Sequence, residues 1–120
     1  MATHNDLGAL GEAIATTYLE QEGFEILELN WRRGKAEVDI IALYEKILIF
    51  VEVKTRSSTA FGRPEEFVSE AKQKLLDYAA NEYIYLLKHK GEIRFDIISV
   101  LFSKDHQHTL NHIKDAFWPS

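Results

Sequence analysis

The sequence predicts an α/β domain in which helices flank one central mixed β-sheet, in the order α-β-β-β-α-β-β. Two observations lead to this prediction: apolar residues recur at helical spacing in two segments, and β-branched runs lie between and after those segments. The chain has 120 residues, of which 46% are hydrophobic, so it suits one domain with one core. We therefore expect residues 1–120 to form a single domain.

The first expected element is a helix over about residues 6–22, where apolar residues recur every three or four positions. Asn5 or Asp6 can cap its start, and Gly23 suits its end. Many of its residues are small, which predicts that another element packs closely against it: Gly8, Ala9, Gly11, Ala13 and Ala15.

Three strands are expected after this helix. An extended stretch covers about 24–31, and two runs rich in β-branched residues cover 38–43 and 47–53. The short connection through Glu45 and Lys46 predicts a hairpin between these two runs. The last run is apolar in its first half, which is typical of a central strand covered on both faces.

The second half of the chain completes the fold with one helix and two strands. Pro64 is placed to open a helix over 65–88, and Gly91 to end it. Its period predicts these buried positions: Phe67, Ala71, Leu75 or Leu76, Ala79 and Tyr83. Runs over 93–100 and 108–113 then predict the last two strands.

The central hairpin carries charged residues where a core is expected. A two-residue loop places Asp39 opposite Glu52 and Glu37 opposite Lys54, with Glu52 and Lys54 on one face. Opposed Cβ atoms lie roughly 4.5–5.5 Å apart, so the two carboxylates repel each other unless a proton or a cation lies between them. The pattern predicts a Mg²⁺ site at Asp39 and Glu52 with Lys54 beside it. A solvated strand edge with ion pairs is the alternative.

Other acidic and histidine residues are further candidate ligands. Glu12 is a third candidate acid, because the small residues around it on the first helix let a sheet or substrate approach. Three histidines, His106, His108 and His112, share a face of the last expected strand, but no acid frames them. We therefore expect structural roles for these histidines rather than a transition-metal site.

The formal net charge of −5 is unevenly distributed along the chain. The first 30 residues contain six acids and no lysine or arginine, so all 14 basic residues lie after them. Phosphate contacts are expected from basic residues on loops beside the hairpin and on the second helix: Arg32, Arg33, Lys35, Arg56, Arg63 and Lys72. An ordinary charged rim is the other interpretation of these residues.

These residues resemble the restriction-endonuclease-like nucleases of the PD-(D/E)xK superfamily. Asp39, followed thirteen residues later by Glu52-Val53-Lys54, is similar to their D…(D/E)xK core, and Glu12 is similar to their helix-borne acid. A longer set of motifs resembles the YraN family of small bacterial proteins: Gly8-x-x-Gly11-Glu12, Asn30-x-Arg32, Glu37-Val-Asp39-Ile-Ile-Ala42, Phe50-Val-Glu-Val-Lys-Thr-Arg56, Phe61-Gly62-x-Pro64 and Arg94-Phe-Asp96.

The resemblance implies a restriction-endonuclease-like fold, similar to that of archaeal Holliday-junction resolvases, and a nuclease site using Mg²⁺ or Mn²⁺. It implies that Asp39 and Glu52 bind the metal together with the Val53 carbonyl. Lys54 would position the attacking water, and Glu12 would complete the site or hold a second metal. The implied partner is nucleic acid, and specifically structured or branched DNA. Symmetric cleavage of a junction would need a homodimer.

Three functions remain open at this point. The first is a metal-dependent endonuclease, the second a non-catalytic nucleic-acid-binding protein with the same fold, and the third a protein-interaction scaffold whose carboxylates pair with Arg32 or Arg56. The intact acids and lysine of the core motif favour the first, because binding alone needs no such set. The acidic first quarter of the chain favours the others.

Composition excludes several classes of protein. With no cysteine, the chain has no disulfide framework, thiolate zinc site or cysteine nucleophile. No apolar run is long enough to span a bilayer, and the first six residues lack the features of a signal peptide. We therefore expect a cytoplasmic protein without a membrane partner.

Overall fold

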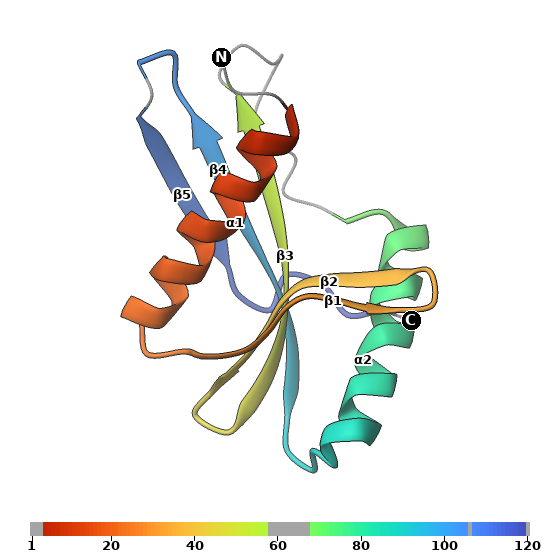
Figure 1. The fold of residues 1–120 in the computed structure, drawn as a ribbon. Helices are drawn as coiled ribbons and strands as arrows, with labels where there is room; N and C mark the ends of the chain where they lie inside the picture. Colours follow the sequence, from red (N-terminus) through yellow and green to blue (C-terminus); the bar gives the residue numbers. More distant parts are fainter. Residues whose placement is uncertain (1–3, 58–67, 106, 120) are drawn as a thin grey trace.

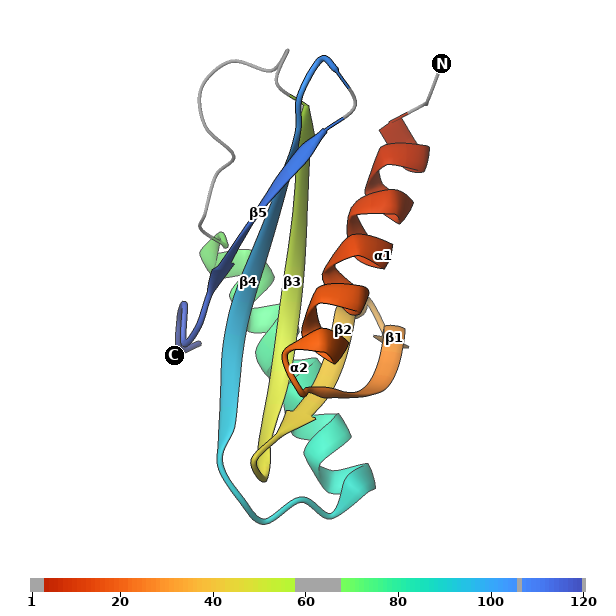
Figure 2. The same cartoon turned by 90° about the vertical axis from the view of Figure 1, so that its left-hand side faces the viewer.

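The computed structural model describes residues 4–57, 68–105 and 107–119. Two helices and five strands follow in the expected order: α1 (His4–Gln21), β1 (Glu25–Arg33), β2 (Ala36–Tyr44), β3 (Ile47–Ser57), α2 (Glu70–Leu87), β4 (Ile93–Phe102) and β5 (His108–Ile113). The strands form one sheet in the order β1-β2-β3-β4-β5. Helix α1 covers one face and α2 the other (Figures 1 and 2).

The sheet is mixed, as expected. Strands β1, β2 and β3 pair antiparallel, β3 and β4 pair parallel, and β5 returns antiparallel to β4. A parallel pair needs a long crossover, and the segment containing α2 supplies it between β3 and β4. The α/β fold class predicted from the sequence is therefore confirmed.

Strand β3 contributes residues to two hydrophobic layers, one on each face of the sheet. Between the sheet and α2, Leu48 and Phe50 of β3 pack in a cluster with these helix residues: Leu76, Ala79, Ala80 and Tyr83. Between the sheet and α1, Ile49 and Val51 pack with Ala15 and Leu19. Ala71, expected on the buried face of α2, is exposed instead, and of the two alternatives Leu75 and Leu76 it is Leu76 that is buried.

Helix α1 packs directly against β3. A Cβ at Gly11 would lie 2.0 Å from the Thr55 hydroxyl oxygen, so only glycine fits there. This is the close packing that the small residues predicted. The helix begins before Asn5 and Asp6, so the prediction that either residue caps it was wrong, whereas Gly23 does follow its end with a φ of +93°.

Helix α2 is shorter than the expected range of 65–88. The Ser69 hydroxyl accepts a hydrogen bond from the Lys72 backbone N–H at 3.2 Å and caps the start. Lys88, with a left-handed φ of 58°, caps the end in place of Gly91. The predicted start at 65 was too early and the predicted end at 88 was one residue too late. The caps at Ser69 and Lys88 define the two ends of the helix. Pro64 and Phe67 lie outside the described residues.

Strand β2 changes face near its middle. Val38 packs in the same cluster as Ile41, although strict alternation would put these two residues on opposite faces. Across the sheet, Asn30 of β1 has a left-handed φ of 51°. Because of this irregularity Glu37 lies on the face opposite to that of Val38 and Ile41, and it pairs with Arg32 on β1.

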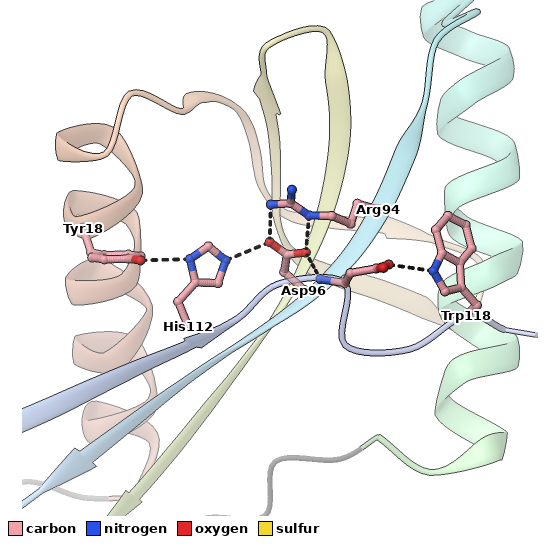
Figure 3. A network of polar contacts seen from close by, with 6 residues as sticks. Tyr18, Arg94, Asp96, His112 and Trp118 are labelled. Carbon is pink, nitrogen blue, oxygen red and sulfur yellow. Dashed lines mark hydrogen bonds and ion pairs between the residues drawn. The ribbon is translucent and has the colours of Figure 1, made fainter.

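A polar network ties β4 to β5 and to α1 (Figure 3). Asp96 is fully buried and accepts two hydrogen bonds from Arg94, both at 2.8 Å. Asp96 also contacts His112, whose Nε2 lies 2.7 Å from Asp96 Oδ2 and whose Nδ1 lies 2.9 Å from the Tyr18 hydroxyl. The network stabilises the packing of α1 and β5 against β4.

The histidines of the last strand have structural roles where they are described. His112 belongs to the Asp96 network, and the ring of His108 packs against Phe102 at 5.9 Å between centroids. His106 lies outside the described residues. Neither helix that the structure describes is both long and apolar enough to span a membrane.

Candidate functional site

The candidate site lies where β2 and β3 separate. Their ladder ends at the pair Ile40 and Val51, so Asp39 and Glu52 are the next residues on the two strands. The Val53 backbone N–H donates a hydrogen bond to Asp39 Oδ2 at 2.8 Å, in place of a bond to the backbone of β2. The side chains of Asp39 and Glu52 contact each other, which is the juxtaposition that the hairpin register predicted.

The two oxygens of Glu52 have different surroundings. The residue is only 3% exposed, and its Oε2 forms an ion pair with the ammonium of Lys72 from the first turn of α2. Its Oε1 is buried and has no hydrogen-bond partner among the residues that the structure describes. A buried carboxylate oxygen without a partner carries a desolvation cost, so it is a position where a cation would be stabilised.

Burial and mutual repulsion disfavour two negative charges on the Asp39–Glu52 pair. The pKa of Asp39 is raised to about 8, mainly by burial and also by the contact with Glu52, against the lowering effect of the Val53 N–H. The pair therefore holds a proton near neutral pH when no cation is present. A divalent cation between the carboxylates would replace that proton.

Glu12 reaches the site from α1. Burial raises its pKa, a hydrogen bond from the Asn30 side chain lowers it, and the charges of Glu37 and Glu52 raise it further. The charge of Glu12 also contributes to the raised pKa of Asp39. However, no three or more His, Cys, Asp or Glu side chains in the described ranges form a group that could hold a metal ion.

The end of β3 carries the basic residues of the site. The strand continues to Ser57, beyond the expected end at 53, so Lys54 and Arg56 lie on the strand rather than at its end or on a loop. Lys54 is two residues after Glu52 and therefore projects from the same face of the sheet. It does not lie opposite Glu37, because the β2–β3 ladder has ended before that point.

Two cavities open beside Glu12. One, of about 320 Å³, lies between the first half of α1 and the end of β3, and its walls include Gly8, Glu12, Val53 and Arg56. The other, of about 380 Å³, is lined by Glu12 together with Asn30 of β1. Glu12 and Arg56 line the first cavity together with Val53, whose backbone N–H donates to Asp39.

Three of the basic residues expected to contact phosphates are ion-paired with glutamates. Arg32 pairs with Glu37, and the Nε of Arg33 lies 3.2 Å from Oε1 of Glu82. Both arginines lie on β1, not on a loop as expected. The third, Lys72, pairs with the buried Glu52.

The remaining basic residues are placed differently. Lys35 is exposed in the turn between β1 and β2, and Arg56 donates a hydrogen bond to the Thr55 carbonyl at 2.8 Å while lining the cavity beside Glu12. Arg63 lies outside the described residues.

Sequence reasoning missed two features of this site. The first is Asn30, whose side chain bonds Glu12; its only signal is that asparagine tolerates a left-handed conformation. The second is the contact of Lys72 with Glu52, because long-range contacts of a helix residue leave no mark in local periodicity.

Comparison with known proteins places this chain among bacterial relatives. Residues 11–100 match the family described as "Uncharacterised protein family UPF0102". A UPF0102 protein of Flavobacterium psychrophilum is 50% identical over 118 residues, which is 98% of each chain. Another from Bacteroides thetaiotaomicron is 46% identical over 119 residues, covering 99% of this chain and 98% of that one.

A solved structure is similar at a lower level. It is that of Pyrococcus furiosus SfsA in complex with Ca²⁺, with 16% sequence identity and a TM-score of 0.44. The similarity covers 89% of this chain, which spans 61% of the length of the SfsA chain.

Proposed function

The chain belongs to the uncharacterised protein family UPF0102, the YraN-like family that its motifs resemble, and we propose that it is a Mg²⁺- or Mn²⁺-dependent endonuclease acting on structured or branched DNA. The observation that carries this proposal is the contact between Asp39 and Glu52, with one buried oxygen of Glu52 left unpartnered among the described residues. A scaffold protein gains nothing from placing two carboxylates together at a cost in stability.

The residues fit a hard divalent cation. Mg²⁺ binds oxygen ligands and is commonly held by one or two carboxylates together with water and substrate phosphate. Asp39 and Glu52 supply the carboxylates. The Val53 N–H points to Asp39, and in an extended strand the carbonyl of the same residue points to the same edge, so this carbonyl is the third candidate ligand. When bound, the cation would polarise the phosphodiester and lower the pKa of a bound water.

The other residues of the site position the substrate and the water. Lys54, on the same face as Glu52, is the residue that orients the attacking water and stabilises charge on the phosphate. Arg56 offers hydrogen bonds to a phosphate that enters the 320 Å³ cavity. Glu12 shares that cavity and, with a pKa raised mainly by burial, is suited to exchange a proton with the water or leaving group.

One observation favours a second candidate function. The ion pair between Lys72 and Glu52 partly neutralises the site from within the chain. A non-catalytic nucleic-acid-binding protein that keeps the fold would be stabilised by this pair and would need no metal.

The test is a cleavage assay with purified protein. It uses Mn²⁺ or Mg²⁺ and labelled single-stranded, duplex, flap and four-way-junction DNA, with Lys54→Ala in parallel and Lys74→Ala, an exposed lysine of α2, as the matched control. We expect metal-dependent cleavage of the junction or flap that is lost in Lys54→Ala and retained in Lys74→Ala. Equal cleavage by all three proteins would identify a contaminating nuclease and count against the proposal.

A second measurement separates the candidates when no cleavage is seen. Mn²⁺ should raise the melting temperature of the wild-type protein, and Glu52→Gln should abolish the rise. Salt-sensitive DNA binding without any metal response would support the non-catalytic candidate. The absence of both responses would leave only the protein-interaction scaffold.

A further inference from the structure

Lys72 forms an ion pair with Glu52, one of the two acids of the site. It lies in the first turn of α2, and its ammonium contacts Oε2 of Glu52, while its own side chain is 49% exposed. Glu52 is buried, whereas the side chain of Lys72 is half exposed to solvent. The lysine can therefore swing outward without repacking the core.

This contact leaves one oxygen of Glu52 unmatched. The Lys72 ammonium contacts only Oε2, while the buried Oε1 has no hydrogen-bond partner in the described parts of the chain. A divalent cation between Asp39 and Glu52 would match the charge of both carboxylates. It would also repel an ammonium held on the same carboxylate, because like charges a few ångströms apart in a partly buried site repel strongly.

We propose that Lys72 is an exchangeable counter-ion of the site, which holds Glu52 when no divalent cation is bound and leaves when one binds. This inference rests on the proposed metal site and adds a regulation to it. The lysine stabilises the metal-free protein and raises the dissociation constant of the cation, because the ammonium must leave Glu52 before the cation can bind there. Lys72 is thus a positioning residue for Glu52 rather than a phosphate contact in the metal-free protein.

The test is calorimetric titration of metal-free protein with Mn²⁺. Lys72→Met removes the charge and keeps the apolar stem, and Lys72→Gln keeps a hydrogen-bond donor for Glu52 should the first variant fold poorly. Both variants should bind Mn²⁺ about tenfold more tightly than the wild-type protein. Lys74→Met, which makes the same charge change two residues away on an exposed position, should leave the dissociation constant unchanged.

A second measurement follows the lysine itself. In the metal-free protein, the Lys72 ammonium should give a distinct ¹⁵N signal because its exchange with water is slowed by Glu52. Addition of Mg²⁺ should move this signal to the position of a solvated lysine. A signal that stays unchanged while Mg²⁺ binds would overturn the proposal, since the ammonium would then remain on Glu52.

The outcomes separate this inference from the proposed function. If the wild-type protein binds Mn²⁺ through Glu52 but both Lys72 variants bind it equally or more weakly, the exchange is wrong and the metal site stands. If neither the wild-type protein nor the variants bind Mn²⁺, the metal site and the exchange both fail. If only the Lys72 variants bind Mn²⁺, the lysine blocks the site and the inference is supported.

Discussion

The position of Glu12 on α1 depends on single residues of that helix. Gly11 and Gly8 are both on this helix, about one turn apart, but they meet different surroundings. A Cβ at Gly11 would collide with Thr55 of β3, whereas a Cβ at Gly8 would have no neighbour within 4 Å. The close approach at Gly11 holds the following residue, Glu12, beside the ends of β2 and β3.

Alanine at these two glycines should therefore have opposite effects. We expect Gly11→Ala to lower the free energy of unfolding by about 1–3 kcal/mol, because the helix must move away from β3. Gly8→Ala should raise it by about 0.5–1 kcal/mol, because alanine restricts the unfolded chain and favours the helix. Urea denaturation measures both values. An equal gain in stability for the two variants would show that α1 does not rest on β3 at Gly11.

At the scale of elements, the β2–β3 hairpin sets the register that brings Asp39 to Glu52. Its two loop residues, Glu45 and Lys46, have φ values of 48° and 70°. Asparagine and glycine favour such a loop. Most other residues carry a conformational cost of roughly 1–2 kcal/mol each at positive φ. The packing of the flanking strands therefore holds a turn that its own residues disfavour.

Replacing this turn with Asn-Gly should stabilise the protein. The double substitution Glu45→Asn and Lys46→Gly is expected to raise the free energy of unfolding by about 1–2 kcal/mol, because both residues accept positive φ more readily. Lys46→Val, which adds a β-branch at the same position, should lower it. The comparison is made by chemical denaturation. If Asn-Gly destabilised the protein, the turn in solution would not have this left-handed geometry.

The Asp96 network also acts between elements, because it joins β4 to β5 and to α1. Burial alone would raise the pKa of Asp96 above its usual 3.8, but hydrogen bonds from His112 and Arg94 and from the backbone N–H of Asp115 lower it overall. A carboxylate with a depressed folded-state pKa stabilises the protein above its unfolded-state pKa. This stabilisation is lost as the pH falls through the folded-state value.

Asp96→Asn should therefore have a pH-dependent effect. At pH 7 we expect it to lower the free energy of unfolding by about 3 kcal/mol, because it leaves Arg94 without its carboxylate. The difference from the wild-type protein should shrink as the pH falls from 3.8 through the lower folded-state pKa, where the folded aspartate also becomes neutral. Urea titrations at several pH values provide the measurement, with the exposed Asp77→Asn as control. A difference that is constant with pH would assign the loss to packing alone.

Local patterns in the sequence were sufficient for the order of the elements and for the contact of Asp39 with Glu52. Both follow from periodicity and from the length of one hairpin loop. The face change of β2 and the conformation of Asn30 were not predictable, because they depend on how the β1–β2 hairpin bends. The partner of Glu52 was missed because the contact of a helix residue with a distant strand leaves no local signal, and Lys72 was assigned to phosphate binding instead.

At the scale of the whole molecule, DNA binding must overcome a net charge of −5. Several of the basic residues around the site are already engaged with acids of the same chain, and Arg33 is an example, with Glu82 at 3.2 Å. Arg56, in contrast, lines the cavity beside Glu12, where a phosphate group could approach it. Any binding should therefore depend on a small number of local phosphate contacts rather than on an extended basic surface.

The salt dependence of DNA binding tests this conclusion. The slope of log affinity against log salt concentration becomes shallower by about 0.9 for each phosphate that the protein no longer neutralises. Arg56→Ala should reduce the slope by about that amount, because Arg56 lines the cavity proposed for the phosphate. Arg33→Ala should change it much less, since Glu82 already neutralises that charge. Fluorescence anisotropy with a labelled four-way junction measures both slopes. Equal changes for the two variants would mean that DNA approaches β1 as closely as the end of β3, and that the bound strand does not enter beside Glu12.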